Sequence, residues 1–321
     1  MNQPRVIFMG TPDFAVTMLK TLLTMDVMVV GVVTQPDRLV GRKKILTPPP
    51  VKELAQTAGI PVFQPVKIKQ AASLATIANW QGDLIVTAAY GQILPESLLA
   101  SMPLGAYNVH ASLLPRYRGG APIQRAIMHE ETETGVTIMT MVKAMDAGPM
   151  WSSCRVSIAK TMTYGELHDQ LAKAGAVLLK ETLPNILAGT ISPIEQDHEQ
   201  VTYAPIITKH DERIDFSQTA SQVCARLRAL YPAPGAFTTL SGKRLKIWLG
   251  EVFEEGGEHG EVGQIIALPS EGPVITCQVG TLLATSLQWE GKTVQSGETF
   301  ANTHRHLLNA KMDRIDQEVN D

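Results

Sequence analysis

The chain has 321 residues, of which 44% are hydrophobic and 18% charged, and its net charge is −3. These values exclude a disordered protein and indicate roughly two globular domains. The small negative net charge also argues against strong nonspecific binding of nucleic acid by the chain as a whole.

Three cysteines lie far apart, at positions 154, 224 and 277. This spacing excludes a disulfide framework and a CxxC metal site, and it indicates the reducing cytoplasm. His304 and His306 are close in sequence, but they would lie on different sides of a helix, so we expect no metal. The first residues read as a strand rather than a signal peptide, and no apolar run reaches the ~18 residues of a membrane helix. We therefore expect a cytoplasmic protein without a membrane segment.

Strands and helical segments alternate along residues 1–190. Short apolar runs predict strands at 5–10, 27–34, 83–89, 106–110 and 134–142. Helical spacing predicts helices at 51–59, at 121–129, at about 163–188 and after Thr11-Pro12, with Thr11 as a helix cap. Such alternation predicts an α/β domain with a mostly parallel sheet that is covered on both faces.

A different pattern begins after a segment at 191–208, which we expect to be a linker. Residues 209–321 contain a short helical stretch and then several short strand candidates between Gly, Pro and charged turns: 236–240, 244–253, 260–268, 273–279 and 280–288. This spacing predicts a small β-barrel or sandwich domain, closed by a helix near 299–309.

Charge is distributed unevenly between these two parts. Residues 1–190 carry 17 basic and 13 acidic side chains, a net charge of +4, whereas residues 191–321 carry 11 basic and 18 acidic ones, a net charge of −7. A polyanionic partner is therefore expected first on the N-terminal part.

The turn after the first predicted strand argues against a dinucleotide-binding protein. It reads Gly10-Thr11-Pro12-Asp13-Phe14-Ala15 and lacks the second and third glycines of a GxGxxG fingerprint. Pro12 has no backbone N–H to offer a phosphate, and Asp13 would repel one.

Asn108 and His110 end the strand at 106–110, so strand alternation places both on one face of the sheet. A histidine at a strand end is often only structural. Here, however, it ends a strand in a parallel sheet, the place where such sheets bind ligands, and a loop rich in Gly and Pro follows. Asp146 lies in the loop after a neighbouring strand and could approach His110.

These three residue types suit the transfer of an acyl group between two amines. The Asn108 amide and a protonated His110 can stabilise a developing oxyanion, while Asp146 can orient the imidazole and favour its charged form. Ser112 is a weaker candidate as a nucleophile, because no base stands near it in a recognisable order. Arg116 and Arg118, further along the loop, could either contact a polyanion or hold the loop.

Longer motifs around these residues resemble the methionyl-tRNA formyltransferases, a family of folate-dependent formyltransferases. The matching stretches are VIFMGTPDFA, VVTQPDR, AYGQILP, NVHASLLPRYRGGAPIQRAI, TGVTIM and MDAGPM. The resemblance covers nearly the whole chain. It implies a Rossmann-like N-terminal domain followed by an OB-like β-barrel, and transfer of formyl from 10-formyltetrahydrofolate to methionine on initiator methionyl-tRNA.

The resemblance also implies roles for individual residues. The catalytic set falls on Asn108, His110 and Asp146. Folate contacts fall on Ser112, Leu113, Leu114, Pro115, Gly91, Gln92, Ile93 and Leu94. The long loop at 35–50 corresponds to a basic segment that reaches the acceptor end of the tRNA, with contacts assigned to Arg38, Arg42, Lys43 and Lys44, whose charges can pair with phosphates.

Other functions stay open on the sequence. The nearest is the same chemistry on a small amine, such as a nucleotide sugar or glycinamide ribonucleotide, or hydrolysis of formyl-folate. The second domain favours tRNA, because a small acceptor would not require it. A nonenzymatic RNA-binding protein is disfavoured by the intact set of Asn108, His110 and Asp146. We expect the protein to be a monomer.

Overall fold

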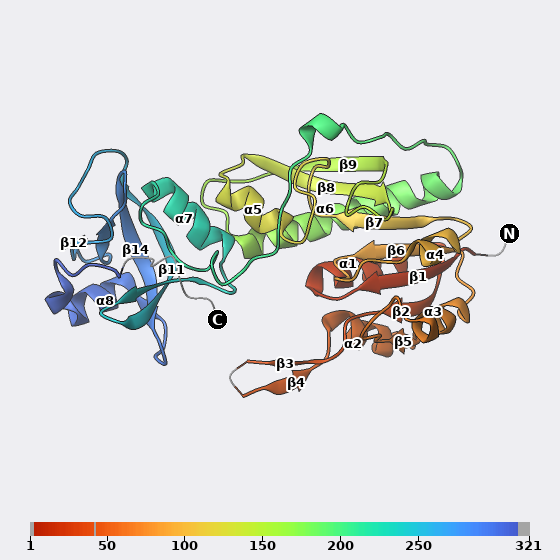
Figure 1. The fold of residues 1–321 in the computed structure, drawn as a ribbon, viewed down its shortest axis with the longest axis horizontal. Coiled ribbons are helices and arrows are strands. Elements are labelled where there is room, and N and C mark those ends of the chain that lie inside the picture. The colour runs from red at the N-terminus through yellow and green to blue at the C-terminus, as the bar shows by residue number, and fades with distance from the viewer. Residues whose placement is uncertain (1–2, 42, 314–321) are drawn as a thin grey trace. The chain divides into compact units, whose positions relative to one another are not determined.

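The computed structural model describes residues 3–41 and 43–313, and the chain packs as two compact units (Figure 1). The first unit comprises Met1–Pro122, Glu133–Ser157 and His168–Pro205, and the second Ile123–Thr132, Ile158–Leu167 and Ile206–Asp321. The units interleave along the chain, and residues 191–205 pack with the first. The limits expected for the domains themselves, 1–190 and 209–321, stay a prediction. Among the described residues, no helix is both long and apolar enough to span a membrane.

The first unit is built on a seven-stranded sheet with the strand order β5-β2-β1-β6-β7-β8-β9. The strands are β1 (Arg5–Gly10), β2 (Met28–Val33), β5 (Val62–Phe63), β6 (Leu84–Ala88), β7 (Ala106–His110), β8 (Glu133–Thr140) and β9 (Met150–Ser157). Pairs from β5 to β7 are parallel, whereas β7–β8 and β8–β9 are antiparallel. The mostly parallel sheet predicted from the sequence is confirmed.

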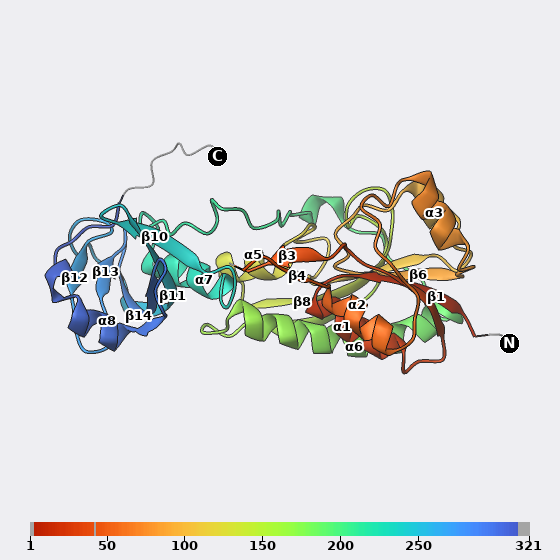
Figure 2. The ribbon, with the colours of Figure 1, turned by 90° about the horizontal axis from the view of Figure 1, so that it is seen from below.

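Helices cover both faces of this sheet (Figure 2). On one side lie α1 (Asp13–Leu22), α2 (Pro50–Thr57) and α6 (Tyr164–Leu187), and on the other lies α3 (Ala71–Ala78). The short helix α4 (Glu96–Ala100) shares a packing cluster with α3. Apolar residues of β1, β6 and β7, among them Ile7, Ile85 and Ala106, pack against Ile77 of α3 and Leu98 of α4. Burial of this apolar surface is the main force that holds the layers together.

The N-terminal cap of α1 differs from the prediction. Pro12 stands at the cap position and makes no side-chain bond, so Thr11 does not cap this helix. Instead, Thr11 Oγ1 donates to the carbonyl oxygen of Tyr90 at 3.0 Å. The hydroxyl thereby ties the end of β1 to the segment that follows β6.

The segment expected as a long loop contains a two-stranded antiparallel hairpin, formed by β3 (Arg38–Val40) and β4 (Ile45–Thr47). At its base, Lys52 Nζ lies 2.7 Å from Asp37 Oδ2, and Gln64 Nε2 donates to Asp37 Oδ1 at 2.7 Å. The hydrogen bonds from Gln64 and then Lys52 lower the pKa of Asp37. These contacts attach the base of the hairpin to α2 and to the segment after β5, within the first unit.

The second unit contains an antiparallel sheet with the order β10-β11-β14-β13-β12, and β15 pairs with β14. Its elements are α7 (Ala220–Ala229), β10 (Ala236–Leu240), β11 (Lys243–Glu254), β12 (Ile265–Ala267), β13 (Val274–Thr276), β14 (Thr281–Trp289), β15 (Gln295–Ser296) and α8 (Gly297–Thr303). The strands predicted for this region are therefore present, and the last helix is shorter than expected.

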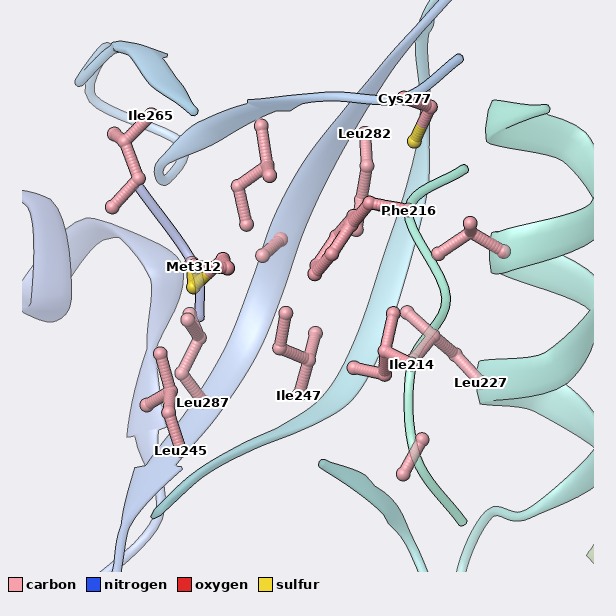
Figure 3. Packing of buried hydrophobic residues seen from close by; sticks show 14 of the residues in the cluster. Ile214, Phe216, Leu227, Leu245, Ile247, Ile265, Cys277, Leu282, Leu287 and Met312 are labelled. Carbon is pink, nitrogen blue, oxygen red and sulfur yellow. The ribbon is translucent and has the colours of Figure 1, made fainter. Parts of the chain in front are cut away.

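Residues 310–313 connect the two edges of this sheet, an element that the sequence did not predict. Met312 forms a bridge with Leu240 of β10, while its N–H donates to Gly263 O, just before β12, at 2.8 Å. The N–H of Asp313 donates to Thr239 O at 2.8 Å. The Met312 side chain enters the core beside Leu245 and Leu287 (Figure 3). The sheet is thus closed into a small barrel.

Met312→Ala is expected to destabilise the second unit by about 2–5 kcal/mol, because it leaves a cavity in the core. Met312 is 4% exposed, whereas Leu308, in the preceding turn, is 47% exposed. Leu308→Ala is the matched control and should change the free energy of unfolding by about 0.5 kcal/mol or less. Urea unfolding of the two variants measures the difference, and equal losses would contradict the packing of the Met312 side chain in the core.

Candidate active site

Asn108 and His110 lie on the same face of β7, near its carboxyl end. Val109, between them, faces α6 on the other side of the sheet, where it packs near Gly175. His110 is only 6% exposed, and Asn108 is half-buried. Strand alternation therefore places both polar side chains on the face opposite α6, as the sequence predicts.

The Asn108 amide is oriented by two neighbours. Thr87 Oγ1, on the adjacent strand β6, donates to Asn108 Oδ1 at 2.7 Å. On the other side, Asn108 Nδ2 donates to Asp146 Oδ1 at 3.4 Å. Because a carboxylate only accepts hydrogen bonds, the nitrogen of the amide must face Asp146. The second hydrogen of that nitrogen has no partner within the network described.

Asp146 brings the three predicted catalytic residues together. Its carboxylate accepts the bond from Asn108, and its Oδ2 lies 3.6 Å from His110 Nδ1. The backbone N–H of Gly119 donates to the same Oδ2 at 2.9 Å. The carboxylate therefore has three nitrogen neighbours, which compensate the cost of its partial burial.

The route of the chain to Asp146 differs from the expected one. β8 runs antiparallel to β7, with Thr140 opposite Tyr107, so the loop at 141–149 leaves β8 level with the beginning of β7. The loop must double back to reach His110. This return requires a close approach at Gly148, where a Cβ would lie 1.9 Å from Thr140 O. The backbone of Asp146 itself has a φ of 49°.

The second ring nitrogen of His110 is held by the backbone. His110 Nε2 lies 2.9 Å from the carbonyl oxygen of Tyr117. A carbonyl oxygen only accepts, so Nε2 carries a proton in this arrangement. The distance from Nδ1 to Asp146 is too long for a hydrogen bond, so Nδ1 is the nitrogen that can still bond to a reacting group.

The segment 112–115 is mostly directed into the protein. Ser112 is fully buried, and its Oγ donates to Arg116 O at 2.7 Å. Leu114 and Pro115 are buried, and Leu113 is half-buried. The hydroxyl of Ser112 thus stabilises the loop rather than serving as a free nucleophile, and the assignment of these four residues as folate contacts stays a prediction.

The segment 91–94, also expected to contact folate, is fixed by Gln92. Gln92 Nε2 donates to Pro65 O at 3.1 Å, and its Oε1 accepts from the N–H of Ile68 at 2.9 Å. Leu94 is buried in the core, whereas the side chain of Ile93 is 63% exposed. Gly91 has a φ of 88°, which permits the turn before Gln92.

The hairpin of β3 and β4 carries the residues predicted to bind tRNA. Arg38, Lys43 and Lys44 are exposed, and Arg42 lies outside the described residues. The hairpin also exposes four large apolar side chains, which the sequence prediction did not consider: Leu39, Val40, Ile45 and Leu46.

Three groups that hold the site were missed from the sequence. They are the carbonyl of Tyr117, the N–H of Gly119 and the side chain of Gln196. Two of them are backbone groups, which nearly every residue has, so the sequence cannot single them out. Gly119 offers a weak signal, because its φ of 123° and a Cβ position 2.6 Å from Ala204 O require glycine. Among residues 3–41 and 43–313, no cluster of three or more His, Cys, Asp or Glu suits a metal ion.

Both parts of the chain match known protein families, and nearly the whole chain matches known proteins. Residues 4–183 match the family described as formyl transferase, and residues 206–305 match the formyl transferase C-terminal domain. A methionyl-tRNA formyltransferase of Bacillus subtilis (strain 168) is 50% identical over 297 residues, which cover 92% of this chain and 93% of that protein. A methionyl-tRNA formyltransferase of Bacillus pumilus (strain SAFR-032) is 47% identical over 315 residues, which cover 98% and 99%.

Solved structures share the fold at low identity. The sugar 3N-formyl transferase WlaRD has a TM-score of 0.63 at 17% identity, with 91% of this chain and 100% of that chain covered. HypX from Aquifex aeolicus, in complex with tetrahydrofolic acid, has a TM-score of 0.60 at 16% identity, with coverage of 100% and 50%. Because the family match spans more than half of the sequence and the curated relatives align nearly end to end, the chain belongs to the formyl transferase family.

Proposed function

We propose that the chain transfers the formyl group of 10-formyltetrahydrofolate to the amino group of methionine on initiator methionyl-tRNA. The observation that carries the proposal is the convergence of Asn108 and His110 on Asp146, at 3.4 and 3.6 Å. This geometry stands in a chain that aligns nearly end to end with methionyl-tRNA formyltransferases at about half identity.

The donors at this site suit a direct transfer of formyl. The hydroxyl of Ser112 is bonded to Arg116 O, so it does not supply a nucleophile for a covalent acyl-enzyme. The N–H groups of Asn108 and His110 can instead act on a formyl group that arrives already activated. The bound 10-formyltetrahydrofolate supplies that group on its nitrogen.

Asn108 Nδ2–H and, in the ring protonated on both nitrogens, His110 Nδ1–H stabilise the negative charge that develops on the formyl oxygen. The methionyl amine forms the new C–N bond, the bond from the formyl carbon to the folate nitrogen breaks, and one proton passes from the amine to that nitrogen. The doubly protonated His110, beside Asp146, gives its Nδ1 proton to the folate nitrogen and then takes the proton of the amine, so the ring ends in its starting state. The Tyr117 carbonyl holds Nε2 and so keeps Nδ1 directed at the reacting group.

The exposed hairpin supports tRNA as the acceptor. Arg38, Lys43 and Lys44 can pair with phosphates, and the apolar side chains of the same hairpin can pack against bases at the end of a duplex. Transfer to a small amine would need no such element. The monomeric state and the cytoplasmic location stay predictions.

One assay decides between these acceptors. The protein is incubated with 10-formyltetrahydrofolate and either charged initiator methionyl-tRNA, glycinamide ribonucleotide or an amino-sugar nucleotide. Formylmethionine should form on the tRNA, with no transfer to the small amines. Transfer to a small amine alone would replace the proposal, and release of formate without any acceptor would indicate a hydrolase.

His110→Ala should lower kcat for formylation by about 10²–10³, because one donor to the developing oxyanion is removed. The release of formylmethionine from the product tRNA measures the rate. His198→Ala, at an exposed position of the same unit, is the matched control and should retain wild-type kcat. Near-full activity of the His110 variant would refute its role.

The double variant Lys43→Glu/Lys44→Glu should raise KM for the tRNA at least about tenfold, because it turns phosphate attraction into repulsion. KM for the folate should stay unchanged. Lys67→Glu/Lys69→Glu makes the same charge change at exposed positions elsewhere in the unit and serves as the control. Steady-state kinetics at two salt concentrations measure both constants, and equal effects on both would contradict the role of the hairpin.

A further inference from the structure

Gln196 is a buried amide in the segment that follows the long helix α6, only 3% exposed. Its Nε2 donates to the carbonyl oxygens of Asp146 and Gly148, both at 2.8 Å. Its Oε1 accepts from Arg118 Nε at 3.0 Å and from Arg118 Nη2 at 2.6 Å. Both hydrogens and both lone pairs of the amide are therefore used, and the orientation of the side chain is unambiguous.

The hydrogen bonds from Gln196 hold the 141–149 loop at Asp146, where its backbone conformation is least favourable. The loop 141–149 doubles back over the sheet, and Asp146 has a left-handed backbone conformation with a φ of 49°. A non-glycine residue in that region costs free energy unless its surroundings hold it there. Gln196 grips the carbonyl of Asp146 itself and that of Gly148, two residues later.

Arg118 connects Gln196 to the 117–119 segment, which contacts His110 and Asp146. Its backbone N–H donates to Thr202 O at 2.9 Å, and its carbonyl accepts from Ala204 N at 2.7 Å, so its position is fixed. The next residue, Gly119, donates its N–H to the Asp146 carboxylate. Arg118, Gln196, Asp146 and Gly119 thus form a closed ring of contacts within the first unit.

We propose that Gln196 is a positioning residue, which through the backbone of the 141–149 loop holds the Asp146 carboxylate against Asn108 and His110. The proposal rests on the proposed formyl transfer. Gln196 acts through Asp146 and touches neither substrate. Because a displacement of about 1 Å at a reacting site can cost about 10²-fold in rate, loosening this loop should lower kcat without weakening the binding of either substrate.

Gln196→Glu separates this role from a purely structural one. The glutamate has the same shape, and its carboxylate pairs with Arg118 at least as well as the amide does. It cannot donate to the two carbonyl oxygens, however, and it places a negative oxygen against both of them. The variant therefore keeps the anchor at Arg118 and releases the loop. Gln170→Glu, at an exposed position on α6 in the same unit, is the matched control.

Steady-state kinetics with charged initiator tRNA and 10-formyltetrahydrofolate should show kcat about 10–100-fold lower for Gln196→Glu. Both KM values should stay within about threefold, and Gln170→Glu should match the wild type. Gln196→Asn keeps the amide on a shorter side chain and should also lower kcat. In the background of Asp146→Ala, Gln196→Glu should change kcat less than about twofold, because the group on which it acts is already absent.

Hydrogen exchange gives a readout that does not depend on activity. Amides of the 141–149 loop and of Gly119 should exchange faster in Gln196→Glu, while those of β1 and β6 should not. Wild-type kcat in the variant, or full additivity with Asp146→Ala, would overturn the proposal. Failure of both Gln196 variants to fold would also overturn it, because the side chain would then support the fold as a whole. An inactive wild type would instead refute the proposed function.

Discussion

A carboxylate that is largely withdrawn from water must be met by donors, and in this protein the Asp146 carboxylate sets that requirement. Removing a negative charge from water costs several kcal/mol unless hydrogen bonds and nearby positive groups replace the solvent. The side-chain amide of Asn108 and the N–H of Gly119 donate to it, and the His110 ring lies beside it. The two chain segments that enclose the site are arranged around this one group.

The same requirement links residues that are distant in sequence. The stretch 117–119 supplies a carbonyl to His110, a guanidinium to Gln196 and an N–H to Asp146. Arg118, at the centre of this stretch, is held by a backbone bridge to residues 202–204. A site of this kind needs no unusual side chain; it needs common ones held in fixed orientations, which agrees with chemistry that depends on positioned donors.

Much of this arrangement could be predicted from the sequence, and the remainder depends on tertiary structure. Apolar runs located β1, β2, β6 and β7, and a period of two placed Asn108 beside His110. β9 was missed because it is a half-exposed edge strand with a mixed polar pattern. The antiparallel course of β8, and with it the returning loop of Asp146, depends on strand pairing that no local pattern shows. The role of Gln196 could not be predicted for the same reason, since its amide donates to backbone carbonyls some 50 residues away in the sequence.

The closure of the small barrel by residues 310–313 has a consequence for biosynthesis. Those residues are translated after every other strand of the second unit, so the ring of backbone hydrogen bonds cannot be completed while they are inside the ribosome. Until then β10 and β12 remain open edges, and open strand edges invite pairing with other chains. The first unit contains no residue beyond Pro205 and can fold earlier. The nascent chain therefore passes through a period in which a folded sheet is tethered to an unfinished barrel that chaperones could protect.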